Sequence, residues 1–241
     1  MDEVTAWDGE HRVTEEATAK RKPPGQTTER IGAFVDAVLA IAMTLLVIDI
    51  PRPDRAVFSV GHGVSKEQAF LNLWHFLVNQ RQALYAYLLA FGILWVVWRQ
   101  HHALFDQYDR ITTAMVQWHF PLLLFAAFLP YSTSVLGDYG DNPMAALLYG
   151  VNVAVILGCR SMVQRAALTG GALVPGADVD RYRREMWVSY AVVAYWVATL
   201  AFVWWAPWSE IPWFFASAVA SVARVFIHRQ QRAVPAQQGP A

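Results

Sequence analysis

A carboxylate lies inside an apolar segment and not at either of its ends. Asp36 is a carboxylate near the start of residues 30–51, a run whose length suits a membrane-spanning helix. A charge inside a bilayer costs roughly 2.5 to 3.5 kcal/mol on insertion scales, so such a residue is kept for a reason. The segment therefore predicts either an ion pathway or a charge that holds helices together.

The histidines are the other groups that could do chemistry. His101 and His102 are adjacent, while His75 and His119 lie elsewhere in the chain. A metal site needs several ligands that converge on one face, whereas adjacent side chains of a helix point about 100° apart. The carboxylates are too scattered for an acid–base pair, and the chain has no Ser-His-Asp or phosphate-loop signature. We therefore expect no metal site, no cofactor and no enzymatic activity.

The composition predicts an integral membrane protein. Of the 241 residues, 56% are hydrophobic and only 16% are charged, which is too apolar for a soluble domain of this length. The net charge is zero and the basic residues form no long block, so nucleic acid is not an expected partner. Apolar runs of spanning length predict an all-α fold with six membrane helices, over residues 31–50, 81–100, 113–136, 143–166, 186–206 and 210–228.

These six helices form one predicted membrane domain, residues 30–228, between two polar tails. We expect residues 1–29 and 229–241 to be disordered cytoplasmic tails, because such polar sequences bury too little apolar surface to fold. Ser65 with Gln68 predicts a capping box for an amphipathic helix over residues 66–79. Asn142 followed by Pro143 predicts the start of the fourth span.

Lys and Arg are distributed unevenly between the two sides of the predicted membrane. If the N-terminus is cytoplasmic, the outer segments hold only four of the 19 Lys and Arg residues, namely Arg52, Arg55, Lys66 and Arg81. Short cytoplasmic loops carry an excess of basic residues in membrane proteins. We therefore expect a multi-pass protein of the plasma membrane with both termini in the cytoplasm.

The first span has two distinct faces when it is drawn as a helical wheel. An aliphatic and aromatic row lies on one side, and Asp36 lies roughly opposite it. At about 9 Å from the cytoplasmic end, Asp36 is level with the inner end of the second span. We infer that Asp36 accepts a hydrogen bond or a charge there and is structural. The row consists of Phe34, Ala37, Ile41, Leu45 and Ile48, and the expected partners of Asp36 are Trp95, Trp98, Arg99, His101 and His102.

The part of the row formed by Ile41, Leu45 and Ile48 has two interpretations. It can face lipid or another helix, as most aliphatic stripes do. Alternatively, it can line a pore, since rings of branched aliphatic side chains close a pore by dewetting. One helix cannot enclose a pore, so the second interpretation needs a closed symmetric oligomer. Thr44 lies about 60° from the row and could add a ring of hydroxyl groups.

Three stretches carry a resemblance to a known family. They are Arg30-x3-Phe34-Val35-Asp36-Ala37-x2-Ala40-Ile41-x2-Thr44-Leu45-Leu46-Val47 in the first span, Tyr87-Leu88-Leu89-Ala90-Phe91 with Trp95 and His101-His102-x-Leu104-Phe105 in the second, and Phe125-x2-Phe128-Leu129-Pro130-Tyr131-x-Thr133 in the third. Together they resemble the transmembrane protein 175 family, the lysosomal potassium channels and their bacterial relatives. The resemblance covers residues 30–136.

The resemblance implies a homotetramer of six-span subunits, in which the first helix lines a central pore. It also implies potassium-permeable conduction without a carbonyl filter. By position, the isoleucine constriction of the family corresponds to Ile41, with Thr44 near the selectivity layer and Leu45 and Ile48 completing the row. The Phe-Ser-Asp motif of the family falls on residues 34–36, so Val35 replaces the serine. The other motif positions that we expect to be structural are Arg30, Phe34, Asp36, Trp95, His101 and His102.

Our leading hypothesis is a channel that passes potassium in preference to sodium through a hydrophobic constriction of the first helix. Its expected partners are further copies of the chain, the lipid bilayer and potassium ions. The alternative is a proton-coupled secondary ion transporter, in which Asp36 and the histidines titrate during transport. A noncatalytic membrane scaffold is a third class, which predicts no ion flux.

Overall fold

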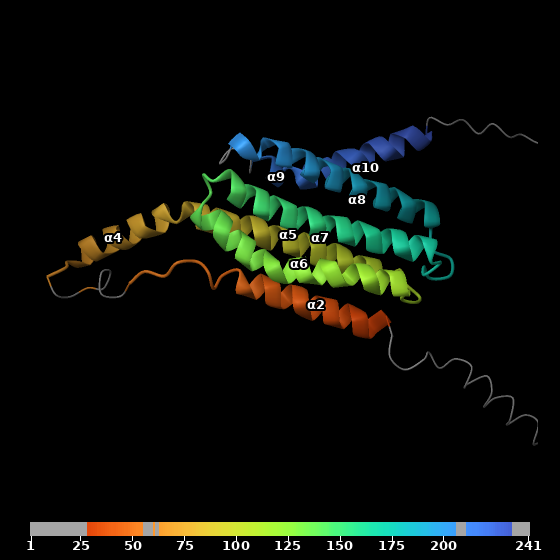
Figure 1. The fold of residues 1–241 in the computed structure, drawn as a ribbon, viewed down its shortest axis with the longest axis horizontal. Coiled ribbons are helices and arrows are strands. Elements are labelled where there is room, and N and C mark those ends of the chain that lie inside the picture. The colour runs from red at the N-terminus through yellow and green to blue at the C-terminus, as the bar shows by residue number, and fades with distance from the viewer. Residues whose placement is uncertain (1–27, 55–59, 61–62, 206–210, 233–241) are drawn as a thin grey trace, which may run out of the picture.

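The computed structural model describes residues 28–54, 60, 63–205 and 211–232, and helices dominate these ranges (Figure 1). The helices are α2 (Thr28–Leu45), α4 (Lys66–Asn79), α5 (Arg81–Phe105), α6 (Thr113–Asp138), α7 (Pro143–Thr169), α8 (Val179–Thr199), the 3-10 helix η1 (Leu200–Trp205), α9 (Ile211–Phe214) and α10 (Ala216–Arg232).

Six of these helices lie side by side along the long axis of the molecule. α6 packs between α5 and α7, α8 packs on α7, and α10 packs on α8. α2 lies at one edge of this bundle, against α5 and α6, and α4 projects beyond the left end of the view (Figure 1). Two ends are therefore distinguished below: the far end, next to α4, and the basic end, where the α5–α6 connection carries Arg110 and the first turn of α8 carries Arg181.

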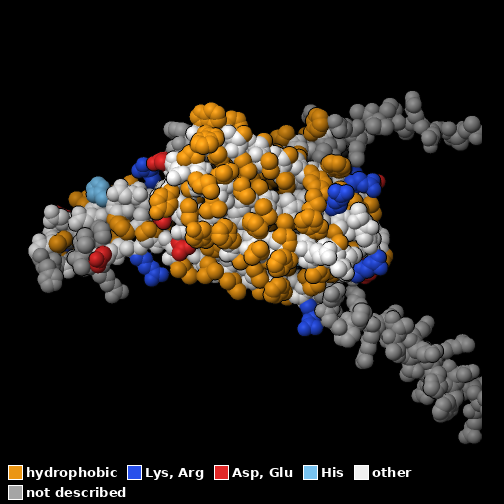
Figure 2. Space-filling model, viewed as in Figure 1, with side chains coloured by type: hydrophobic (Ala, Val, Ile, Leu, Met, Phe, Trp, Pro, Cys, Tyr) orange, Lys and Arg blue, Asp and Glu red, His pale blue; other side chains and the backbone are white. Residues whose placement is uncertain are grey.

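The surface of the bundle fits a membrane environment. Hydrophobic side chains cover the middle of the visible face, while Lys and Arg are found toward its ends (Figure 2). Among the described residues, four helices are long and apolar enough to cross a bilayer: α5, α6, α7, and α8 continued by η1. These four agree with the predicted second to fifth spans.

The first and sixth predicted spans differ in extent from the helices that are present. α2 ends at Leu45, and turns over residues 46–49 lead to Pro51, which cannot continue a helix. The sixth predicted span is divided into α9 and α10 at Phe215. Both spans therefore stay predictions. α10 continues to Arg232, into the range predicted as a tail, while residues 1–27 and 233–241 lie outside the described residues.

Local sequence signals define where several helices begin. The Ser65 side chain accepts a hydrogen bond from the backbone N–H of Gln68 at 3.2 Å, so the predicted cap of α4 is confirmed. Asn142 caps α7 in the same way, through Met144 N–H at 2.9 Å, with Pro143 in the first turn as predicted. Each cap satisfies a backbone donor that the helix itself cannot pair.

α6 and α7 are joined by a buried polar contact in an otherwise apolar interface. Pro121 and Pro130 both lie inside α6, where each proline removes one backbone donor. Next to Pro130, the Ser132 hydroxyl donates to the Leu129 carbonyl at 3.0 Å and accepts a hydrogen bond from Asn152 of α7 at 2.8 Å. Such interhelical hydrogen bonds fix the register of membrane helices.

Candidate functional site

α2 buries one face against its own subunit. Val35, Leu39, Ala42 and Leu46 are buried, and they recur every three or four residues, which places them on one stripe of the helix. This stripe contributes to the main hydrophobic core together with residues of α5, α6 and α7. α2 is therefore held by a packed apolar face, and its opposite face is left uncovered.

The uncovered face of α2 carries the row that was predicted as a pore lining. Ile41 is 58% exposed, Ile48 57% and Leu45 40%. Thr44 is exposed on the same side, and its hydroxyl donates to the Ile41 carbonyl at 2.8 Å, which leaves the lone pairs of the hydroxyl oxygen available. Ile41, Thr44 and Leu45 thus share one face of α2, directed away from the subunit core, and Ile48 is exposed in the turn that follows the helix.

Small side chains lie beside this row. Ala33, Ala37 and Ala40 are all exposed, and with Thr44 they are spaced by four, three and four residues. At this spacing they form one seam along the helix, next to the larger side chains of Ile41 and its neighbours. Small residues in such a seam let the backbones of two membrane helices approach closely.

Asp36 lies beside the inner part of α5, toward the basic end. Its Oδ2 atom is 3.6 Å from Nδ1 of His102, which makes an ion pair when His102 is protonated. Its Oδ1 atom is buried and has no hydrogen-bond partner among the described residues. Trp98 stacks on His102 with ring centroids 5.9 Å apart, and Trp95 lies 5.0 Å from Trp98. Asp36 is therefore directed toward an aromatic cluster of α5 and away from the row.

The remaining motif residues do not join Asp36. His101 is buried on another side of α5. The centroid of its ring lies 4.4 Å from that of Phe105 and 5.2 Å from that of His119 of α6. Arg30 and Phe34 are exposed on α2. The structure thus separates the adjacent histidines: His102 faces Asp36, and His101 belongs to the packing between α5 and α6.

The sequence prediction missed a buried polar region at the basic end. Arg160 of α7 is only 7% exposed, although it lies toward the end of the predicted fourth span, residues 143–166. Its Nη1 atom lies 3.5 Å from the Ser189 hydroxyl. Tyr182 donates to the Gln164 carbonyl at 3.0 Å and shares a 3.0 Å hydrogen bond with Tyr108. Burial, with Tyr182 beside it, raises the pKa of Tyr108 well above its usual value, so the phenol stays neutral.

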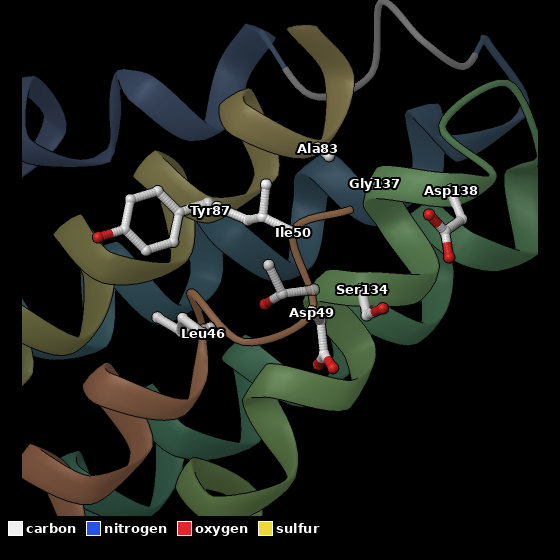
Figure 3. Close-up of a pocket in the computed structure, with 9 residues that line it drawn as sticks. Leu46, Asp49, Ile50, Ala83, Tyr87, Ser134, Gly137 and Asp138 are labelled. Atoms are coloured by element: carbon white, nitrogen blue, oxygen red, sulfur yellow. The ribbon is translucent and has the colours of Figure 1, made fainter. Parts of the chain in front are cut away.

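A small pocket lies at the far end, where the turn after α2 meets α5 and α6 (Figure 3). Asp49 comes from this turn and Asp138 from the end of α6, so two carboxylates border the pocket. The helices are close there, since a Cβ on Gly137 would lie 3.0 Å from the Cα of Ala83. Within the described ranges, no three His, Cys, Asp or Glu side chains gather closely enough to hold a metal ion.

Comparisons with known proteins agree with this geometry. Residues 30–130 match the family model described as the endosomal/lysosomal potassium channel TMEM175. These residues include α2, α5 and most of α6, the elements that carry the uncovered face and the Asp36 cluster.

Bacterial relatives cover most of the membrane region. A potassium channel of Chamaesiphon minutus is 31% identical over 160 residues, which are 65% of this chain and 74% of that protein. A potassium channel of Streptomyces collinus is 30% identical over 64% of this chain and 71% of that protein. The mouse endosomal/lysosomal proton channel TMEM175 is 27% identical over 64% of this chain, which is 27% of the mouse protein.

A solved structure gives the same fold. The crystal structure of a lysosomal potassium-selective channel TMEM175 homolog from Chamaesiphon minutus aligns with a TM-score of 0.61 at 23% identity, over 86% of this chain and 98% of that one. The family model, the bacterial relatives and the shared fold lead to one conclusion: this chain belongs to the TMEM175 family.

Proposed function

We propose that this chain is a subunit of a potassium-permeable channel in which four copies surround a pore with the uncovered face of α2. The observation that carries the proposal is the exposure of Ile41 and Leu45 on an edge helix whose other face is packed, together with the exposure of Ile48 in the turn that follows. The potassium-channel names of the bacterial relatives support the same activity.

Two features favour a neighbouring α2 helix over lipid as the partner of this face. A lipid-facing stripe needs only large apolar side chains, whereas this face also holds the small seam of Ala33, Ala37 and Ala40 and the hydroxyl of Thr44. Small residues favour close contact between helices. In a closed ring of copies, the seam packs against the next α2 helix and the larger side chains beside it are directed to the axis.

The pore would select ions by a hydrophobic constriction. A ring of four Ile41 side chains offers no ligand that could replace the water around an ion. Potassium sheds its hydration shell at a lower cost than sodium does, so a narrow apolar ring favours potassium. Leu45 and Ile48 extend the ring toward the far end, and the Thr44 hydroxyl supplies a polar oxygen about one turn from Ile41.

Asp36 keeps a packing role in this proposal. It contacts His102 on α5, on the side of α2 away from the candidate pore row, and an unpaired carboxylate would be costly there. Val35 is fully buried where the family motif has serine, so its side chain adds apolar contact to the core. The Asp36 contact with α5 would therefore set the rotation of α2 and hence the direction of the row.

The alternative is proton-coupled transport, and the animal relatives are named proton channels, which makes proton movement a relevant activity to test. Purified protein in potassium-loaded liposomes separates the two functions. A channel equilibrates potassium down its gradient, and a pH gradient cannot drive potassium uphill through it. Uphill accumulation of potassium driven by protons would instead establish a transporter. The absence of any ion flux would favour the third class, a noncatalytic membrane scaffold.

A further inference from the structure

α4 has an exposed apolar surface that the described residues of its own subunit do not cover. Phe70 is 68% exposed and Trp74 56%, and Leu71, Leu77 and Val78 are exposed as well. At 100° per residue these five side chains fall within an arc of about 120° centred on Trp74. We refer to these five residues as the α4 apolar arc. Contiguous apolar surface of this kind marks an interaction site.

The polar side chains of α4 lie on another face. Gln68, Asn72, His75 and Asn79 are exposed and spaced by four, three and four residues, which makes a narrow stripe along the helix. The side that turns to the subunit is different again, since Ala69 is buried and Leu73 and Phe76 are half-buried. The helix is thus divided into a face toward its own chain, a polar stripe and the uncovered apolar arc.

The position of α4 excludes the lipid tails as the simplest cover for the arc. α5 is 25 residues long, so at 1.5 Å per residue it extends for about 37 Å and already crosses the roughly 30 Å hydrocarbon core. α4 begins beyond the far end of α5 and projects away from the bundle (Figure 1). In this position the arc is presented to water above the bilayer, at a cost that a protein partner would remove.

We propose that the α4 apolar arc packs against α4 of neighbouring copies, so that four α4 helices form a helical cap over the far end of the channel. The proposal rests on the tetramer of the proposed function. A cyclic oligomer brings the same arc of every subunit to the same height around one axis. The contact would bury an aromatic anchor, Trp74, at its centre.

The charges of α4 are compatible with contact between copies. The arc itself carries no charge, and Lys66 and Glu67, the charged residues of the helix, lie together in its first turn. Their opposite signs avoid net repulsion between identical neighbours. The polar stripe would then face water on the outside of the cap.

Site-directed cross-linking tests the contact on the full chain. Cys159 is the one cysteine of the sequence and is buried, so Cys159→Ser gives a background without a competing thiol. Trp74→Cys places a thiol at the centre of the arc. His75→Cys is the matched control, since it is the next residue but points about 100° away into the polar stripe. A short bismaleimide is added to the protein in liposomes, and bands of cross-linked subunits are measured.

We expect several-fold more cross-linked subunits for Trp74→Cys than for His75→Cys, at a ratio that does not change when the protein is diluted in lipid. Equal cross-linking in a protein that light scattering shows to be tetrameric would overturn the contact and leave the proposed function intact. Quenching by brominated lipid of a fluorophore at residue 74 would also overturn it, by showing lipid on the arc. A monomer without potassium flux would overturn both.

A second variant removes the apolar arc without a thiol. Trp74→Gln combined with Leu77→Gln should lower the temperature at which the tetramer dissociates, while potassium flux at low temperature stays that of the parent protein. Asn72→Gln combined with His75→Gln is the matched change in the polar stripe and should leave the dissociation temperature unchanged. Equal dissociation temperatures for both double variants and the parent protein would contradict the cap.

Discussion

The two sides of the bundle differ in how completely their apolar side chains are buried within the subunit. In the region of α6, α7 and α8, large side chains such as Trp196 and Tyr149 are fully buried, and several buried polar groups form hydrogen bonds within the subunit. The Trp196 indole donates to the Gly150 carbonyl at 2.8 Å, for example. α2 buries only one stripe and exposes another of similar character. The difference shows that apolar character alone does not identify the core. The channel function is proposed for the side where α2 leaves an apolar stripe exposed.

The largest expected effect separates the two faces of α2 itself. Leu39→Ala removes a fully buried side chain and should lower the free energy of subunit unfolding by about 2 to 5 kcal/mol. Leu45→Ala is the same substitution on the uncovered face and should change this free energy little, while it alters ion conduction. Unfolding in detergent measures the first effect and bilayer recording the second. An equal loss of unfolding free energy in Leu39→Ala and Leu45→Ala would contradict the difference between the packed and the uncovered face of α2.

Ile41→Asn should have the next largest effect, on selectivity. A ring of amides wets the constriction, so we expect a larger leak and a potassium-over-sodium preference reduced by about tenfold, equivalent to about 1.4 kcal/mol in the relative barriers. Bilayer recordings with both ions give the ratio. Leu124→Asn is the control, because Leu124 is an exposed aliphatic residue of another helix, α6, and is not part of the candidate pore row. Unchanged conductance and selectivity in Ile41→Asn would remove Ile41 from the pore.

Asn152→Leu tests the side of the bundle formed by α6, α7 and α8. It removes the hydrogen bond to Ser132 between α6 and α7, and interhelical hydrogen bonds in membranes contribute about 0.6 kcal/mol on average and up to about 1.7. We expect a lower free energy of unfolding with normal ion selectivity. A double-mutant cycle with Ser132→Ala assigns the loss to the pair. Altered selectivity with unchanged stability would show that conduction also depends on this side.

Asp36→Asn should have the smallest energetic effect. Partly exposed ion pairs contribute about 0.2 to 1 kcal/mol, and the His102 side chain is itself 61% exposed. The expected result is a lower yield or less complete tetramer assembly, seen by size-exclusion chromatography, with the ion preference retained. Normal assembly combined with a changed ion preference would contradict the packing role of Asp36.

Local features of the fold could be predicted from the sequence, because their causes lie within a few residues. The caps at Ser65 and Asn142 are of this kind, and so is the common face of Ile41 and Leu45, which follows from helical periodicity; the turn at residues 46–49, which contains Ile48, does not follow from it. Which face is uncovered does not follow from periodicity, since both stripes of α2 are apolar. That distinction needed the position of α2 at the edge of the bundle.

Contacts between distant segments could not be predicted. His101 and His102 are neighbours in sequence, but only the packing of α5 against α2 and α6 decides that His102 faces Asp36 and His101 faces His119. Arg160 is a second case. An arginine in an apolar run was the available signal, but the run does not indicate that its side chain is buried beside Ser189 of another helix.

The central claim is that the uncovered face of α2, continued by the turn that contains Ile48, lines the ion path. The most direct test is to modify a cysteine at residue 48 and to record whether the potassium current is blocked. The measurement uses Ile48→Cys in the Cys159→Ser background, in a planar bilayer, with a charged thiol reagent. We predict that modification of Ile48→Cys blocks the potassium current while the parent background is insensitive. Complete modification of the thiol, verified by mass spectrometry, with an unchanged current would contradict a pore lined by α2.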